Sequence, residues 1–340
     1  MDYYTIMATK KQVSKKKKAD VLTEKFQPKK RDSLKILDLM SRKLSEKNLE
    51  SFKDCSTYNS FIATESKEIH KLIGSNACKL RFCPICDWRK ARKDAFMIYT
   101  MMKAIQAEQK YEFIFLTLTT PNVVGDDLKS EIDRFNKSFH KLFKRRNVMR
   151  SVKGYIRKLE VTHNTLADTY NPHFHVILAV NRSYFTDKNY YISQKKWLEM
   201  WRECTGMTGV TENGTDEITQ LHIKKVQGLK EDNTISEVAK YSVKSFEMSN
   251  SEKVFNYFYD SLRGRQLITF HGVFKDYRQK FKSGELDKYK DIDTNEYIYG
   301  LVAEWNEKYR KYERQYRLLS EEEKKRFNNA YDEETEVEDD

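Results

Sequence analysis

A succession of short apolar segments between Phe113 and Phe246 constrains the fold of this 340-residue chain more than any other feature. Alternating or β-branched runs are typical of strands, and apolar residues three and four positions apart are typical of helices. The predicted strands are Phe113–Thr119, Tyr155–Thr162, Phe174–Val180 and Ile218–Val226, and the predicted helices are Leu128–Phe143, Ser193–Cys204 and Ile235–Phe246. The first six elements run strand, helix, strand, strand, helix, strand. This order predicts an α+β fold with a ferredoxin-like, RRM-like core, in which helices cover one face of an antiparallel sheet.

Composition divides the rest of the chain. Residues 1–34 are polar and lysine-rich, and they are predicted to form a disordered basic arm. Residues 35–104 are expected to be a mainly helical region, and they contain four of the five cysteines. Residues 105–250 hold the predicted core. Residues 251–340 are rich in tyrosine and lysine, and we expect a helix-rich C-terminal region that ends in the acidic tail Asp332–Asp340.

The net charge indicates the class of partner. Lysine and arginine number 63, aspartate and glutamate number 51, and the net charge is +12. An excess of this sign favours a polyanion, either nucleic acid or an acidic membrane. No apolar stretch is long enough to span a bilayer, and residues 1–20 lack the apolar core of a signal peptide. We therefore expect a cytoplasmic, nucleic-acid-binding protein without a membrane partner, whose cysteines are reduced.

His173 and His175 flank a phenylalanine at the start of a predicted strand. Side chains alternate along a strand, so the two imidazoles share one face and Phe174 points to the other. Two imidazoles on one face suit a divalent metal, and a carboxylate oxygen would complete an open site. Glu160 is the geometric candidate for the third ligand, because it lies on the preceding strand and a hairpin would bring it beside the pair. The alternative is a pair of half-buried structural histidines.

The predicted helix Ile235–Phe246 has an apolar side and a side of unusual polar composition. The polar residues, at spacings of three, four and seven, are Glu237, Lys240, Tyr241 and Lys244. Taken alone, they would form an ordinary solvated face with ion pairs.

Together, the histidine pair and this helix point to a reaction. A phenol has a pKa near ~10, so as a nucleophile it needs neighbouring cations and a polarised electrophile. Lys240, Lys244 and a metal at the histidine pair supply both. We therefore predict that Tyr241 attacks a DNA phosphodiester and nicks one strand. Glu237, one turn earlier, is placed to act as a general base on water.

A cysteine cluster predicts a second metal site. Cys78, Cys83 and Cys86 lie within nine residues, and this spacing in a reducing compartment is typical of a closed structural zinc site. The fourth ligand would be Cys55 or His70. The remaining cysteine, Cys204, lies among tryptophans and is expected to be an inert core residue.

A basic run follows the cluster and begins with Trp88. Its cations are candidates for phosphate contacts, although a solvated helix face would have the same composition. The candidate DNA-binding residues are Arg89, Lys90, Arg92 and Lys93, together with Lys240.

Three segments, in order, resemble the motifs of a known family. FLTLTTP (Phe115–Pro121), NPHFHVILAV (Asn171–Val180) and EVAKYSVK (Glu237–Lys244) are similar to the three motifs of rolling-circle plasmid replication initiators (Rep), which are HUH endonucleases. The resemblance extends from about Cys55 to the last helices. No second tyrosine follows Tyr241 at one-turn spacing, so the one-tyrosine class fits.

The resemblance implies roles for individual residues. His173 and His175 match the metal ligands, Tyr241 the nucleophile, Lys244 the phosphate-orienting lysine and Glu237 the acidic residue that replaces a second tyrosine. It implies Mg²⁺ or Mn²⁺ as the catalytic metal. It also favours Cys55 over His70 as the fourth ligand of the structural Zn²⁺.

The resemblance also implies a course of events. The protein would bind a plasmid double-strand origin, nick one strand, stay linked to the 5′ phosphate and leave a 3′-hydroxyl primer. Glu237 would activate water when the displaced strand is terminated and rejoined. Host helicase and polymerase are the implied partners, and homo-oligomerisation is left open. The alternatives are a one-tyrosine transposase or relaxase, or a non-catalytic zinc-containing DNA-binding regulator.

Overall fold

The computed structural model describes residues 20–328, apart from 212–213, 215, 219, 231–232, 241–247 and 249–250. Tyr241 and Lys244, and with them the nucleophile and the phosphate-orienting lysine predicted from the sequence, lie outside the described residues.

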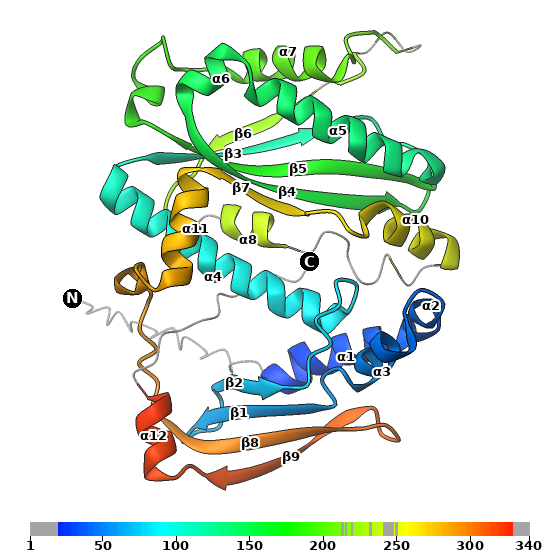
Figure 1. Ribbon diagram of the computed structural model, residues 1–340, viewed down its shortest axis with the longest axis vertical. Helices are drawn as coiled ribbons and strands as arrows, with labels where there is room; N and C mark the ends of the chain where they lie inside the picture. The colour runs from blue at the N-terminus through cyan, green and yellow to red at the C-terminus, as the bar shows by residue number, and fades with distance from the viewer. Residues whose placement is uncertain are drawn as a thin grey trace, which may run out of the picture.

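Strands β6-β3-β5-β4-β7, in this order, form an antiparallel five-stranded sheet within the described part of the chain (Figure 1). The strands are β3 (Glu112–Thr119), β4 (Val152–Asn164), β5 (Thr169–Val180), β6 (His222–Lys225) and β7 (Ile268–Gly272). The hairpin β4–β5 is longer than the alternating sequence predicts, because pairing continues through the polar residues up to the turn. Strand β6 is shorter than the predicted segment 218–226.

Helices cover both faces of this sheet. Helices α5 (Leu128–Phe143) and α7 (Gln194–Thr205) lie on one face, where Phe135 of α5 stacks on Phe174 of β5 at 4.4 Å between ring centroids (Figure 1). Helices α4 (Pro84–Gln109), α8 (Thr234–Ala239) and α11 (Val273–Ser283) lie on the other face. The two helices of the predicted core thus lie on one face, as expected, and helices from flanking segments cover the other. The sequence order of the core elements gives no information about helices contributed by flanking segments.

A second antiparallel sheet, β2-β1-β8-β9 among the described strands, brings together residues 58–75 and 297–318 (Figure 1). Its strands are β1 (Tyr58–Thr64), β2 (His70–Ser75), β8 (Tyr297–Asn306) and β9 (Lys311–Leu318). Helix α4 lies between the two sheets. Its Trp88 packs with Phe61 and Leu301 of the second sheet, whereas its later residues pack on the central sheet.

The second sheet adds strands that the sequence did not predict to both flanking regions. Strands β1 and β2 lie within residues 35–104, beside α4 and shorter helices, and residues 251–328 contribute β7, β8 and β9 beside α11 and further helices. The predicted disordered arm is helical from residue 22, because Leu22 and Phe26 are buried against the second sheet.

The remaining helices are short and lie around the two sheets. They are α1 (Gln27–Lys35), α2 (Leu37–Ser41), α3 (Glu46–Asp54), α6 (Arg146–Ser151), α10 (Glu252–Leu262) and α12 (Glu321–Phe327), with short helical turns at Leu22–Phe26, Gly125–Asp127, Arg182–Phe185 and Asp287–Tyr289. Within the described ranges, no helix has the length and apolar character needed to cross a membrane.

Helix α8 ends earlier than the sequence predicts. Its last residue is Ala239, and Lys240 is extended at φ −47° and ψ 167°. The predicted helix Ile235–Phe246 is therefore interrupted at Lys240, and its remainder, residues 241–246, lies outside the described residues.

Candidate functional site

Glu160, His173 and His175 converge on the face of the central sheet that α8 covers. In the β4–β5 hairpin, Glu160 lies directly opposite His173. The Glu160 Oε2 atom lies 3.0 Å from His175 Nε2 and 3.4 Å from His173 Nε2. Phe174, between the two histidines, points to the opposite face and packs in the core under α5. The hairpin register and the alternation of side chains thus bring together the three residues that the sequence nominates as a metal site.

Each imidazole is oriented by a second contact through Nδ1. His173 Nδ1 lies 3.2 Å from the backbone carbonyl oxygen of Asn171, and because a carbonyl only accepts, this nitrogen carries the proton. His175 Nδ1 lies 3.4 Å from Thr117 Oγ1. Contacts of this kind hold the rings of metal-binding histidines. Because His173 is held through Nδ1, its Nε2 is the atom that would bind a cation lying between the ring and the Glu160 carboxylate.

The spacing of these donor atoms fits a six-coordinate metal ion. At a metal–ligand distance of about 2.1 Å, neighbouring ligands of an octahedron are roughly 3.0 Å apart. One ligand atom from each of the three residues lies within 4.8 Å of the others, and the two Glu160 distances are close to the octahedral value. Three protein ligands leave positions open for phosphate oxygens and water. The group therefore fits Mg²⁺ or Mn²⁺.

The electrostatics of Glu160 agree with a ligand role. Burial acts to raise the pKa of this carboxyl group, but the two imidazoles that face it outweigh burial and hold its pKa well below the usual range. The group is therefore a carboxylate at neutral pH, although its side chain is only 9% exposed.

We expect Glu160→Gln to weaken Mn²⁺ binding at least about 10- to 100-fold, since loss even of a residue that supports a ligand has this effect. Isothermal titration of Mn²⁺ into the zinc-loaded protein measures the change. Glu313→Gln is the matched control. Glu313 lies on β9 in the second sheet, and its carboxylate accepts a hydrogen bond from the Asn306 side chain. An unchanged Mn²⁺ affinity in Glu160→Gln would remove Glu160 from the site.

Helix α8 packs on the sheet face that carries this site. Val238 and Ala239 are buried with Ile156 of β4 and Ile177 of β5. Glu237 is partly exposed and pairs with Lys240, whose Nζ lies 2.8 Å from its Oε1. The chain therefore reaches Lys240, the residue before Tyr241, from a helix that is anchored beside the metal site.

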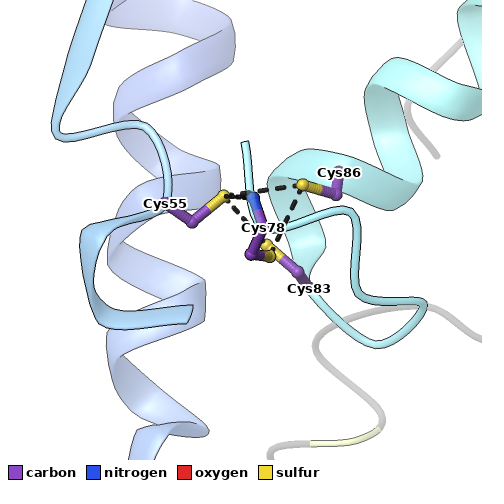
Figure 2. A group of neighbouring side chains, drawn as sticks. All are labelled: Cys55, Cys78, Cys83 and Cys86. Atoms are coloured by element: carbon purple, nitrogen blue, oxygen red, sulfur yellow. Dashed lines mark hydrogen bonds between the residues drawn. The ribbon is translucent and has the colours of Figure 1, made fainter. Parts of the chain in front are cut away.

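The cysteine cluster is assembled from three segments (Figure 2). Cys55 follows α3, Cys78 lies after β2, Cys83 precedes α4 and Cys86 is in its first turn. The Cys55 sulfur lies 3.5 Å from that of Cys86 and 3.6 Å from that of Cys83, and the sulfurs of Cys78 and Cys86 are 3.6 Å apart. These separations are much longer than a disulfide bond of about 2.0 Å.

The same separations fit tetrahedral zinc. Four sulfurs at about 2.3 Å from a central Zn²⁺ are roughly 3.8 Å from one another. Backbone amides point at the cluster as well, since the N–H of Lys79 donates to Cys86 Sγ at 3.3 Å. His70 Nε2 lies instead 3.1 Å from the Tyr316 hydroxyl, on the second sheet. The structure thus brings together the four-cysteine set rather than one that includes His70.

Lys30 ties the N-terminal helix to the cysteine cluster. Its side chain is fully buried, and its Nζ donates to the backbone carbonyls of Lys53 at 2.9 Å and Cys55 at 2.8 Å. Burial lowers the pKa of Lys30, and the neighbouring Cys55 opposes this effect. Four thiolates around Zn²⁺ carry a net charge of −2, which a buried ammonium stabilises.

The basic run lies on α4, directly after the cluster. Lys90 forms an ion pair with Asp94, the Arg92 guanidinium lies 5.4 Å from the Trp88 ring centroid, and Lys93 is exposed. Cys204 is buried in the core beside Trp201, as the sequence predicts for an unreactive residue.

Two residues near the candidate metal site were not identified as site residues from the sequence. Lys158 lies opposite His175 across the hairpin and is almost fully buried, and Asn171 supplies the carbonyl that orients His173. Lys158 and Glu160 are two residues apart on one strand, so their side chains share a face of the sheet. This spacing is the signal by which the sequence could have identified Lys158 as a site residue.

Comparisons with known proteins agree with the motifs. Residues 69–316 match the replication protein family (Rep_1). The chain is 49% identical to "Protein rep" of Staphylococcus aureus over 221 residues, which cover 65% of this chain and 93% of that protein. It is 31% identical to "Protein rep" of Streptococcus pneumoniae serotype 2 (strain D39 / NCTC 7466) over 288 residues, which cover 81% and 87% of the two chains. No solved structure matches the chain. The family predicted from the three motifs is confirmed: this chain belongs to the replication protein family of plasmid Rep initiators.

Proposed function

We propose that this Rep protein starts rolling-circle replication by nicking one strand of the plasmid origin with Tyr241. The observation that carries the proposal is the grouping of Glu160, His173 and His175 on the sheet face where α8 packs. Tyr241 comes two residues after the end of that helix. We infer that the phenol, which follows α8 in the sequence, acts at this metal-binding group.

The topology of the central sheet supports an HUH core. Strands β3, β4, β5 and β6 with helices α5 and α7 follow the split βαβ order, and they are arranged as β6-β3-β5-β4. The histidines lie on β5, in the middle of this unit. Strand β7 and the helices on the second face are additions to it.

The chemistry is a phosphoryl transfer to tyrosine. A bound Mg²⁺ or Mn²⁺ supplies Lewis-acid polarisation of the scissile phosphate. The Tyr241 oxygen forms a bond to phosphorus, the bond from phosphorus to the 3′ oxygen breaks, and the 3′ oxygen takes up a proton. The products are a 5′-phosphotyrosine link and a free 3′-hydroxyl, from which a host polymerase extends behind a host helicase. Lys244 orients the phosphate, and Lys240 adds positive charge beside the phenol.

Termination uses Glu237 rather than a second tyrosine. Its partly exposed carboxylate lies four residues before Tyr241, where it accepts a proton from water that attacks the second phosphodiester. The water oxygen forms a bond to phosphorus, and the 3′ oxygen leaves and takes up a proton. This 3′-hydroxyl then attacks the 5′-phosphotyrosine link, the Tyr241 oxygen leaves, and the displaced strand is joined.

A covalent-adduct assay tests the proposal. Zinc-loaded protein is incubated with Mn²⁺ and a 3′-labelled single strand from the plasmid's own origin, and the products are separated under denaturing conditions. We expect a labelled protein band whose tryptic phosphopeptide maps to Tyr241, and no band when EDTA removes the Mn²⁺. The absence of an adduct, or its mapping to another residue, would refute the proposal. A non-catalytic DNA-binding regulator would shift the strand in a native gel without forming the adduct.

A further inference from the structure

A basic cleft lies between α4 and the edge strand β7. Its volume is about 710 Å³. Helix α4 and the loop before it form one wall, Gln266–Ile268 and Arg278 of α11 form the other, and Lys158 of β4 and Ala239 of α8 lie between them. We refer to this feature as the α4–β7 cleft.

Positive charge dominates the lining. Of the described residues that line the cleft, seven are cationic and two are acidic. The cations come from four segments: Lys79, Arg81, Arg89, Lys90, Lys93, Lys158 and Arg278. The acids are Asp87 and Asp94, and Asp94 is already paired with Lys90. A concave surface of one sign concentrates a ligand of the opposite sign.

Two guanidinium groups in the cleft have unsatisfied donors. The Nε atoms of Arg89 and Arg278 are buried, and among the described residues neither has a hydrogen-bond partner. A buried donor without a partner lowers the stability of the fold. These two arginines line opposite walls of the cleft, α4 and α11, so an anion in the cleft would lie between two guanidinium groups.

The cleft lies on the same face of the central sheet as the candidate metal site. Lys158, in its lining, lies opposite His175 in the β4–β5 hairpin and two residues before Glu160. Ala239, also in the lining, follows Glu237 by two residues on α8.

We propose that the α4–β7 cleft binds the phosphodiester backbone of single-stranded DNA next to the nick site. This inference deepens the proposed nicking function and rests on it for the identity of the polyanion. A volume of about 710 Å³ is within the range that encloses a drug-sized ligand, which corresponds to roughly one or two nucleotides. The lining has no aromatic ring among the described residues, so the cleft holds phosphates rather than stacking bases. Binding is therefore independent of base sequence.

A salt titration tests the cleft. Fluorescence anisotropy measures binding of a labelled dT12 strand to full-length, zinc-loaded protein without Mn²⁺ over a range of NaCl concentrations. We expect Arg89→Gln/Arg278→Gln to weaken binding and to reduce the slope of log K against log [NaCl] by about 1.4, since each phosphate contact on a single strand contributes about 0.7. If this variant loses its thermal transition, Lys79→Gln/Lys93→Gln replaces it, because both lysines are exposed.

The control removes the same charge elsewhere. Lys308→Gln/Lys311→Gln alters the β8–β9 hairpin of the second sheet, away from the cleft, and its slope should stay within about 0.3 of the wild type, as expected when no phosphate contact is lost. An unchanged slope in both cleft variants, or an equal loss in the control, would overturn the proposal. So would a larger loss for a 12-base-pair duplex than for dT12. Failure of the adduct assay would refute nicking and leave this measurement unaffected, so the two failures are distinguishable.

Discussion

Tyr241→Phe should abolish the covalent protein–DNA adduct while dT12 binding stays within about twofold of wild type. Phenylalanine keeps the ring and loses only the oxygen that forms the bond to phosphorus. Removal of an enzyme nucleophile lowers kcat by on the order of 10⁶, which is below detection in a gel assay. The measurement is the adduct assay with Mn²⁺, together with anisotropy on the same preparation.

Glu237→Ala is the informative contrast, because it alters the second step of the proposed cycle. We expect this variant to form the adduct at the wild-type rate and to accumulate it, since water is no longer activated at termination. An adduct in Tyr241→Phe would show that another residue is the nucleophile. An equal loss of nicking in both variants would indicate that Glu237 acts before the first cleavage.

Cys83→Ser should remove the structural zinc and lower the thermal midpoint by about 10 °C or more. A structural Zn²⁺ contributes on the order of 10 kcal/mol to the folding of small domains, and each kcal/mol corresponds to about 2–4 °C in a domain of about 150–250 residues. Loss of even about half of this contribution therefore lowers the midpoint by about 10 °C. The cluster joins three segments, so its loss also releases the start of α4 and the helix anchored by Lys30. Elemental analysis and calorimetry of the purified variant measure both effects.

Cys204→Ser is the matched control for the zinc prediction. Cys204 is also buried, but it lies in the core beside Trp201 and outside the cluster. Its substitution should leave one Zn²⁺ per chain and a modest loss of stability of about 1–3 kcal/mol from the buried hydroxyl. Full zinc content and an unchanged midpoint in Cys83→Ser would contradict the four-cysteine site.

Local periodicity was sufficient to predict the parts of the site that lie on one hairpin. The alternation of side chains in 155–180 fixes which residues share a face, and the short polar turn between the two strands fixes their antiparallel pairing. Glu160 and His173 are therefore opposite one another, as the parity argument requires. The cysteine spacing is equally local, since three of the four thiols belong to one short segment.

The sequence contains no comparable signal for strand pairing between segments that are far apart in the chain. Strand β7 joins the edge of the central sheet and β8 pairs with β1, yet neither has a sequence pattern that names its partner. The bounds of helix α4 are also hard to predict from sequence. The helix is buried against two sheets and therefore has no single apolar stripe. The break in the predicted helix at Lys240 likewise left no signal in the helical spacing.

The pairing of β1 with β8 has a consequence for synthesis. Phe61 lies opposite Leu301, so the two partners are about 240 residues apart in the chain. At a translation rate of about 5–20 residues per second, β1 waits roughly 10–50 s for its partner after it is made. During this interval the edge of β1 that later pairs with β8 is unpaired, and among the described strands of the second sheet only β2 lies beside β1. A nascent chain therefore completes the layer that supports α4 and the cysteine cluster only after the whole central sheet has been made.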